Sequence, residues 1–489
     1  MKNHAPHECT CNCSRRNFLK ATSAAALLPS VINAVVHDAE SASLPRIAPA
    51  GPASKYTPSI KAAFVRRRGD YGILWPGAIY DGETALVSYR NQVEKAAKDL
   101  GLKISVRPEP IYSLGEADTW LAEAKTEGCD GLLVVLLDRQ QHAWPTAAKA
   151  IDSGRPSLVF APVGSAFTTN TGPLAKKTGA FIASTDDFNQ VVYGLKMIRA
   201  GTKLRETRFV VLAGNERKDT RIENLGTRLR YLPARSFLDE YDRTSIDDEV
   251  RQIAAEYIRN AAFVSGPSEQ DVLNGVKSYV VARKVLEREE GDGITMDCLG
   301  ALGKTQVSLP CIAWSRMLDH GIPAACEADL GAAITHAVVQ YLFDRPGFQQ
   351  DPVPETSKEA IIGAHCTCPT RLDGFTAPPA TYYLSHHHGM RDAVPRPEWR
   401  IGQRVTVAVI GGLNDPNRLP PHMYISSGSV LENVAVPPSG GCVVSVSVKL
   451  DGVTDVLDYP GFHQLFFYGD YKKRLREFCQ LYGIEARVL

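Results

Sequence analysis

The sequence has little excess charge of either sign and no long hydrophobic run beyond its N-terminal region. Lysine and arginine together number 55, and aspartate and glutamate together number 54. This balance gives no support for a nucleic-acid partner or an anionic membrane partner. No apolar stretch beyond residue 42 is long enough to cross a bilayer. We therefore expect neither a nucleic acid nor a membrane span in the mature chain.

A nucleotide-binding loop and a disulfide framework are also missing. The first expected strand runs into residues 66–70, RRRGD, where a dinucleotide-binding loop would need G-x-G-x-x-G. Residues 300–305 resemble the end of a P-loop, but Cys298 stands where the earlier glycine is required. The missing dinucleotide-binding loop weighs against a nicotinamide-dependent oxidoreductase. The eleven cysteines show no dense spacing, and most sit singly in apolar runs, as small buried residues do.

The N-terminus carries an export pattern. Residues 14–20 read SRRNFLK, a twin-arginine motif, and an apolar stretch follows. This predicts a removable signal over residues 1–42, cleaved near Ala34 or Ala42. It implies the twin-arginine (Tat) export machinery as a partner and a periplasmic or extracellular location. Three cysteines of open role precede the arginine pair: Cys9, Cys11 and Cys13.

The rest of the chain divides into regions that differ in composition and in hydropathy pattern. With 489 residues it is long enough for about three domains. Residues 43–59 are rich in proline, alanine and serine and predict a linker. Alternating strand-like and helical patterns predict two doubly wound, Rossmann-like α/β domains over residues 60–200 and 201–345. Alternating strands with proline- and glycine-rich turns predict a C-terminal antiparallel β-barrel-like domain with a terminal helix over residues 346–489.

Polar side chains follow short apolar runs between residues 293 and 369. Glu327 comes after such a run and before a helical pattern, which places it at the carboxyl end of a strand, where open α/β sheets bind ligands. Asp351 follows the Arg345-Pro346-Gly347 loop, and His365 ends a second apolar run. Two carboxylates and an imidazole form a candidate site for a hard metal ion.

Each of these residues also has a structural alternative. Glu327 could cap a helix, Asp351 could shape a turn, and His365 could be a core histidine. Asp297 ends another strand-like run and could either contact a substrate or cap the following turn. The HHH run at residues 386–388 could bind a metal or a sugar, but we expect a solvated loop for at least two of its members.

The region around Glu327 resembles the L-fucose isomerase / L-arabinose isomerase superfamily of metal-dependent aldose–ketose isomerases. The matching segments are residues 326–329, 346–352, 364–366 and 461–470. The resemblance extends from about residue 60 to the C-terminus and is most specific from residue 293 onward. It implies Glu327, Asp351 and His463 as metal ligands, His365 as a further ligand or substrate contact, and Mn²⁺ or Mg²⁺ as the cofactor.

The same resemblance implies an activity. Glu327 and Asp351 would move a proton through an enediol while the cation polarises the carbonyl of an L-fucose- or L-arabinose-like monosaccharide. It also implies a homo-oligomer. The export signal departs from the cytoplasmic sugar isomerases, so the alternative is an exported sugar-binding protein that keeps the fold without turnover. A zinc hydrolase built on His365 and the neighbouring Cys366 and Cys368 is a third possibility.

Overall fold

The computed structural model describes residues 49–69, 81–139, 141–387, 390–413, 420–435 and 442–489. The predicted export signal, with Cys9, Cys11 and Cys13, lies outside the described residues, and so does His388. From Pro45 onward the chain forms one unit. None of the helices in these ranges has the length and apolar character needed to span a membrane.

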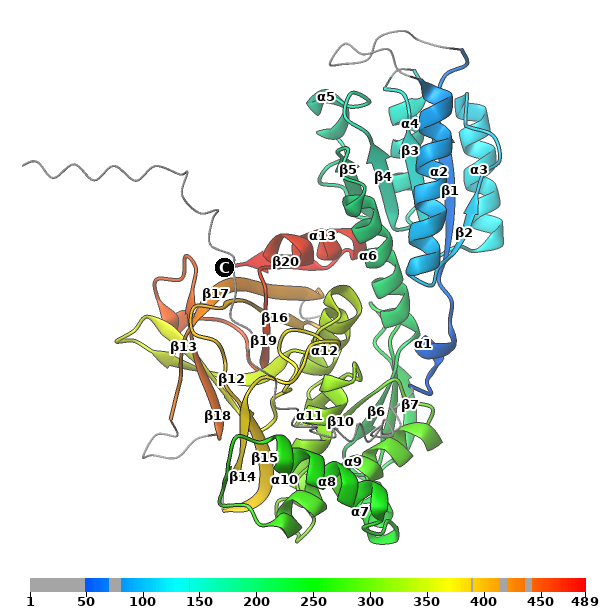
Figure 1. Cartoon of the computed structure of the whole chain (residues 1–489). Helices are drawn as coiled ribbons and strands as arrows, with labels where there is room; N and C mark the ends of the chain where they lie inside the picture. Colours follow the sequence, from blue (N-terminus) through cyan, green and yellow to red (C-terminus); the bar gives the residue numbers. More distant parts are fainter. Residues whose placement is uncertain (1–48, 70–80, 140, 388–389, 414–419, 436–441) are drawn as a thin grey trace, which may run out of the picture. The chain divides into compact units, whose positions relative to one another are not determined.

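The first sheet is entirely parallel. Its strands are β1 (Ser59–Val65), β2 (Lys103–Val106), β3 (Gly131–Leu136), β4 (Ser157–Ala161) and β5 (Ala180–Ser184). Their order across the sheet is β2-β1-β3-β4-β5. The helices around this sheet are α2 (Gly82–Asp99), α3 (Leu114–Glu127), α4 (Ala143–Asp152), α5 (Thr168–Thr171) and α6 (Asn189–Glu206) (Figure 1), whereas the short helix α1 (Pro52–Lys55), which precedes β1, lies away from the sheet.

Alternate residues of β1 enter two different cores. Ile60 and Phe64 pack with residues of α2 and α6, whereas Ala63 and Val65 pack with residues of α3 and α4. Strand β3 is buried along its whole length. A sheet covered on both faces explains why these strands are continuous apolar runs in the sequence.

The second sheet is mostly parallel. Its strands are β6 (Arg208–Leu212), β7 (Lys218–Arg221), β8 (Arg228–Leu232), β10 (Gly293–Met296) and β11 (Ala324–Cys326). The order is β11-β10-β6-β8-β7, with only β7 antiparallel to its neighbour. Its helices are α7 (Arg235–Arg243), α8 (Asp248–Asn260), α9 (Glu269–Arg288), α10 (Cys298–Leu302), α11 (Cys311–Asp319) and α12 (Leu330–Phe343).

The C-terminal part contains a closed antiparallel barrel. Its strands are β12 (Phe348–Glu355), β13 (Ala360–His365), β16 (Arg404–Gly411), β17 (His422–Asn433), β18 (Val444–Leu450) and β19 (Gln464–Tyr468). They follow one another in the order β16-β19-β12-β13-β18-β17, and pairing of β16 with β17 closes the ring. Strand β20 (Glu485–Val488) follows the terminal helix α13 (Lys472–Tyr482) and joins β17 in parallel. A separate small sheet contains β9 (Val264–Ser265), β14 (Tyr382–His387) and β15 (Arg391–Pro397).

The expected mixed α/β fold with a C-terminal antiparallel barrel is therefore present. The division into two Rossmann-like domains, with the boundaries given above, stays a prediction. The stretch predicted to be a linker, residues 43–59, includes the short helix α1 and the first residue of β1. Asp292 explains why α1 forms there, because its carboxylate accepts hydrogen bonds from the backbone nitrogens of Ala53 and Ser54.

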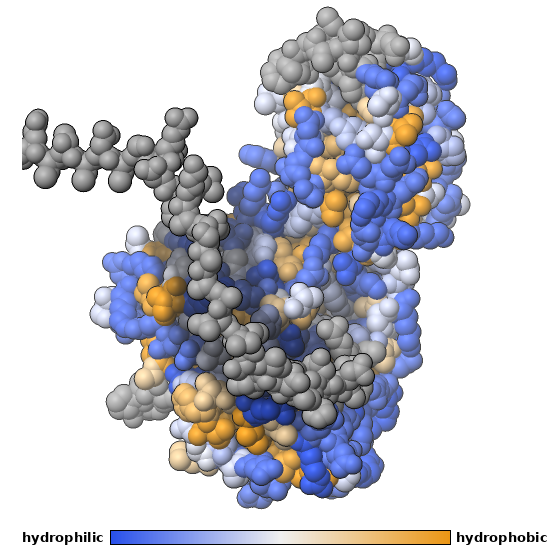
Figure 2. Space-filling view, in the orientation of Figure 1, coloured by the Kyte–Doolittle hydropathy of each residue, from blue (hydrophilic) through white to orange (hydrophobic). Residues whose placement is uncertain are grey.

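Helix α12 connects the second sheet with the barrel. Nearly all its residues are buried, and it shares one hydrophobic core with α6 and with strands β16 and β19. The hydroxyl of Thr335 accepts a hydrogen bond of 3.0 Å from the backbone nitrogen of Ile410 on β16. This contact sets the end of β11, just before α12, beside the barrel. The face of the molecule shown in Figure 2 is mostly hydrophilic, with scattered hydrophobic patches.

Candidate metal centre

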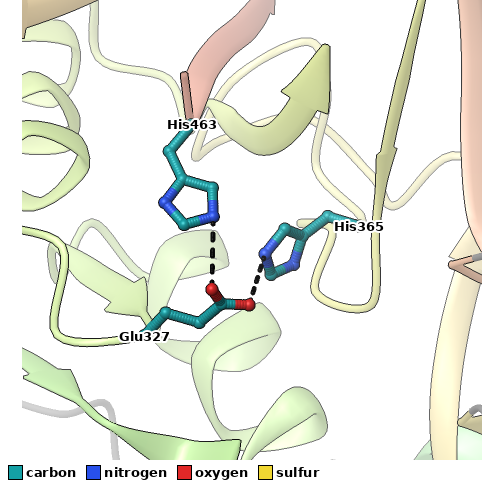
Figure 3. A group of neighbouring side chains, drawn as sticks. All are labelled: Glu327, His365 and His463. Atoms are coloured by element: carbon teal, nitrogen blue, oxygen red, sulfur yellow. Dashed lines mark ion pairs between the residues drawn. The ribbon is translucent and has the colours of Figure 1, made fainter. Parts of the chain in front are cut away.

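Three side chains from distant parts of the chain point toward one another (Figure 3). Glu327, His365 and His463 each present one ligand atom within 4.8 Å of the others. Nε2 of His365 lies 3.7 Å from Oε1 of Glu327, and Nε2 of His463 lies 3.5 Å from Oε2 of the same carboxylate. Both imidazoles are buried, whereas the Glu327 side chain is 36% exposed. One side of the cluster therefore faces solvent.

Asp351 belongs to the same cluster through strand pairing. It pairs with Ala364 on β13, and the preceding Gln350 pairs with Gln464 on β19. This register puts residue 351 at the level of both histidines. Oδ1 of Asp351 lies 3.1 Å from Nε2 of His463. The structure thus brings together the three residues expected as metal ligands and His365, which was expected as a further ligand or a substrate contact.

The backbone around the cluster is unusual. Glu327, Ala328 and His463 have positive φ angles of 62°, 54° and 49°. A non-glycine residue in this left-handed region costs on the order of 1–3 kcal/mol and persists only where the surroundings enforce it. The turn after β11 sends the chain into α12 and leaves the Glu327 carboxylate facing the two histidines. Such strain gathered on ligand-bearing residues is typical of functional sites.

Asp329 supports His463 from behind, a role that sequence reasoning missed. Its Oδ2 lies 2.9 Å from Nδ1 of His463, while its Oδ1 accepts a hydrogen bond of 2.7 Å from the nitrogen of Ala332 and caps α12. A proton on Nδ1 donated to Asp329 leaves the Nε2 lone pair facing Glu327 and Asp351. Buried carboxylates hold metal-binding histidines in this way. In the sequence, Asp329 stands directly before a helical pattern. This position indicates a helix cap but not the contact with His463.

Negative charge exceeds positive charge in this cluster, because three carboxylates surround a single protonated imidazole. Burial lowers the pKa of His463, but its hydrogen bond to Asp329 and the negative charges of Asp329 and Asp351 outweigh this effect and raise the pKa to about 9. Burial raises the pKa of Glu327, and the negative charges of Asp351 and Asp329 add to this while His463 opposes it. Burial also pushes the pKa of Asp329 upward, but the His463 hydrogen bond holds it below its usual value. Three carboxylates therefore share one imidazolium.

The donor atoms fit a hard divalent cation. Within the described chain, Nε2 of His463 and Oδ1 of Asp351 are buried atoms that form no hydrogen bond of good geometry, although they face each other. Two carboxylates with one or two imidazoles form a donor set suited to Mn²⁺ or Mg²⁺. The sequence alternatives of a turn for Asp351 and an isolated core histidine for His365 do not describe this arrangement.

The other indicated residues have different surroundings. The Asp297 carboxylate accepts a hydrogen bond of 3.0 Å from the nitrogen of Gly300 and caps α10, so the capping alternative is realised. A substrate contact by Asp297 stays a prediction. The expectation of a solvated loop for the HHH run was wrong for His386 and His387, which lie in β14, and His387 is buried. Pairing with β15 and β9 makes this segment a strand.

Cys366 and Cys368 do not form the zinc site that was considered. Both are buried. Among the described residues, the group with metal-ligand geometry is Glu327, His365 and His463, and it contains neither cysteine. Nothing in the geometry therefore supports a zinc hydrolase built on these thiols.

Comparisons with known proteins find structural likenesses but no family. No family model matches the chain, and no curated protein matches it significantly. Among the solved structures that match is a molecule called XylFII, with 12% identity over 49% of this chain and 79% of that chain and a TM-score of 0.16. Another is an ABC-transporter periplasmic solute-binding protein from Actinobacillus succinogenes with bound D-allose (13% identity, 58% and 92% covered, TM-score 0.19). A third is a periplasmic sugar-binding protein from Legionella pneumophila (10% identity, 58% and 96% covered, TM-score 0.16). TM-scores of 0.16 to 0.19 are too low to carry an argument about this chain.

The assignment to the L-fucose / L-arabinose isomerase superfamily is corrected here, and with it the expected isomerase activity. No family model and no curated protein match the chain, so nothing supports the resemblance. The physical reason for the error is that Glu327, Asp351 and His463 describe only a ligand set for a hard cation. Such a set serves binding as well as catalysis, so its spacing does not identify a reaction. The comparisons give no support for metal binding either, so the metal assignment depends on geometry alone.

Proposed function

We propose that this protein binds a sugar or a related polyol through a divalent cation held by Glu327, Asp351 and His463, without converting it. The observation that carries the proposal is the convergence of these side chains and His365 from the turn after β11, from β12 and β13, and from the residue directly before β19. Mn²⁺ or Mg²⁺ is the cation that this donor set favours. When bound, it supplies positions that neighbouring hydroxyl oxygens of a sugar can occupy.

The chain's own residues favour a carbohydrate over other oxygen ligands. The carboxylate of Glu327 is partly exposed and can accept a hydrogen bond from a sugar hydroxyl. Phe462 stands beside His463 with ring centroids 4.4 Å apart, and its side chain is 60% exposed. An exposed aromatic ring next to a polar cluster offers a flat apolar face for the C–H side of a sugar ring. Glu327 and Phe462 thus offer partners for the hydroxyl groups and for the apolar face of a sugar.

The proposed location is outside the cytoplasm. It depends on the twin-arginine pattern before residue 42, which also implies the export machinery as a partner. The expectation of a homo-oligomer came from the corrected resemblance and loses its basis with it.

The proposal is tested by metal and sugar titrations of metal-free protein. We expect Mn²⁺ to bind in isothermal titration calorimetry and a member of a monosaccharide panel to raise the melting temperature only when Mn²⁺ is present. A sugar at 100 times its dissociation constant stabilises the folded state by about 2.7 kcal/mol. Glu327→Gln and Asp351→Asn should lose Mn²⁺ binding. Asp373→Asn, which alters an exposed carboxylate paired with Arg400, is the matched control.

A second pair of variants separates the sugar from the cation. Phe462→Ala should retain Mn²⁺ binding and lose the sugar-dependent stabilisation. Phe167→Ala removes another half-exposed ring, 50% exposed and far along the chain, and should retain both. Absence of Mn²⁺ binding in the wild type, or equal sugar stabilisation with and without Mn²⁺, would contradict the proposal. Steady conversion of an aldose to a ketose would contradict the part that excludes turnover.

A further inference from the structure

Cysteines gather beside the metal centre. The eight cysteines of the described chain are all thiols. Five of them adjoin the elements that carry the site: Cys298, Cys311, Cys326, Cys366 and Cys442. Cys326 directly precedes Glu327, and Cys366 directly follows His365. Nothing in the proposed sugar binding uses these thiols.

The thiols are arranged in two pairs at the ends of neighbouring strands. His365 pairs with Val444 at the end of the ladder between β13 and β18. Cys366 and Cys442 lie just beyond this last pair, one residue after His365 and two residues before Val444. The pKa of each of these two thiols is shifted chiefly by the other, so their side chains are neighbours. Cys298 and Cys326 form the second pair, near the ends of β10 and β11, and likewise shift each other's pKa.

The two pairs differ in their access to solvent. Cys442 is half-buried, whereas Cys298, Cys326 and Cys366 are buried. The Cys326 thiol also contacts the Thr367 hydroxyl, with Sγ 3.4 Å from Oγ1. Exchange with a dissolved disulfide needs one thiol that the reagent can reach. Of these two pairs in the described chain, only Cys366 and Cys442 provide one, through the half-buried Cys442.

We propose that Cys366 and Cys442 form a reversible disulfide beside the metal centre. The thiolate of Cys442 attacks one sulfur of a small disulfide such as oxidised glutathione and releases one thiol. The thiol of Cys366 then attacks the Cys442 sulfur of the mixed disulfide and releases the second thiol. The protein loses two protons and two electrons in total, and the small disulfide is reduced to two thiols.

The bond has a structural consequence for the site. It fastens the end of β13, which carries His365, to the start of β18. It also closes a long loop, from residue 366 to residue 442, and a cross-link over a long loop restricts the unfolded chain. The oxidised protein is therefore expected to melt at a higher temperature than the reduced protein. This inference does not depend on metal or sugar binding.

The test uses the purified, fully reduced folded chain. After treatment with oxidised glutathione, remaining thiols are alkylated and the protein is digested and examined by mass spectrometry. We expect a peptide cross-linked through Cys366 and Cys442, with Cys298 and Cys326 alkylated. Cys442→Ser should abolish both the cross-link and the rise in melting temperature. Cys368→Ser is the matched control, because this neighbouring buried thiol bonds to the carbonyl of Pro369 instead, and it should retain both.

Two results would overturn the proposal. One is a lasting glutathione adduct on Cys442 with Cys366 still alkylated, because it would show that the second attack does not occur. The other is a cross-link through Cys298 and Cys326 that leaves Cys366 and Cys442 as thiols. Since Cys442→Ser changes a half-buried side chain, its circular dichroism spectrum under reducing conditions checks that it folds.

Discussion

The hydrogen bond between Asp329 and His463 gives the sharpest test of the metal centre. Asp329→Asn keeps the cap of α12, since asparagine caps helices as well as aspartate does. It removes the charge that holds the His463 proton on Nδ1. An asparagine amide group facing Nδ1 donates a hydrogen bond and moves that proton to Nε2, the atom that faces Glu327 and Asp351. In the variant, Nε2 therefore carries the proton and has no lone pair to offer the cation.

The expected size of the effect follows from similar supporting carboxylates. Removing one typically weakens metal binding by 10- to 100-fold, or about 1.4 to 2.8 kcal/mol. We expect Mn²⁺ affinity in titration calorimetry to fall within this range, while the melting temperature without metal changes little. Asp329→Ala should lose the cap as well and destabilise the metal-free protein by about 1 kcal/mol.

The pH dependence of this loss has a definite sign. The pKa of His463 is raised to about 9, so below this pH the wild-type imidazole is protonated and a cation must displace the proton. In Asp329→Asn the pKa of His463 is lower, so the proton competes less with the cation for this imidazole. The loss of affinity should therefore be larger at pH 8.5 than at pH 6.5. Equal Mn²⁺ affinities of wild type and Asp329→Asn at both pH values would refute the assigned role of Asp329.

Three further predictions concern stability. Burial raises the pKa of Asp319 to about 6 despite its hydrogen bonds from Thr370 and Arg371. The folded state then holds a proton more tightly than the unfolded state, so this group's contribution to stability falls as pH rises from about 4 to about 6, by roughly 3 kcal/mol. The melting temperature of Asp319→Asn should therefore rise relative to that of the wild type as the pH increases from about 4 to about 6. Parallel plots of melting temperature against pH for the two proteins would contradict this prediction. A Cβ added to Gly201 would lie 2.0 Å from the Tyr482 ring. Gly201→Ala should therefore lower the melting temperature by an amount equivalent to about 1–3 kcal/mol. Adding Tyr482→Leu to this variant should restore part of the loss. Both ring nitrogens of the fully buried His336 form no hydrogen bond within the described chain, so His336→Leu should raise the free energy of unfolding by about 1 kcal/mol in urea denaturation; a decrease would show that His336 has a partner.

Local patterns predicted much of the fold. The continuous apolar run of β3 and the alternating pattern of β18 indicated a buried parallel strand and a barrel strand, and both are present. The strand type depends on which faces are covered, and residue-by-residue hydropathy records this directly. The HHH run failed because His386 and His387 become part of a strand by pairing with β15, the next segment of the chain. The other neighbour of β14 is β9, which is distant in the sequence and which local composition does not reveal.

The candidate ligands were predictable one at a time. Glu327 and His365 stood out because each lies at the end of an apolar run, and Asp351 stood out because it follows the Arg345-Pro346-Gly347 loop. His463 came only from the family resemblance, which proved wrong as an assignment, although the structure still places His463 in the cluster. Asp329 was visible only as a helix cap, since its second hydrogen bond reaches a histidine far away in the chain.

By itself, the sequence determined the order of helices and strands, the apolar faces that they bury and the residue types available for a hard cation. The tertiary structure decided which of those residues meet. Strand register sets Asp351 level with both histidines, and the packing of α12 against β16 brings Glu327 to the same point. These contacts join segments that are distant along the chain, and the spacing of residues along a chain does not specify the distance between its folded parts.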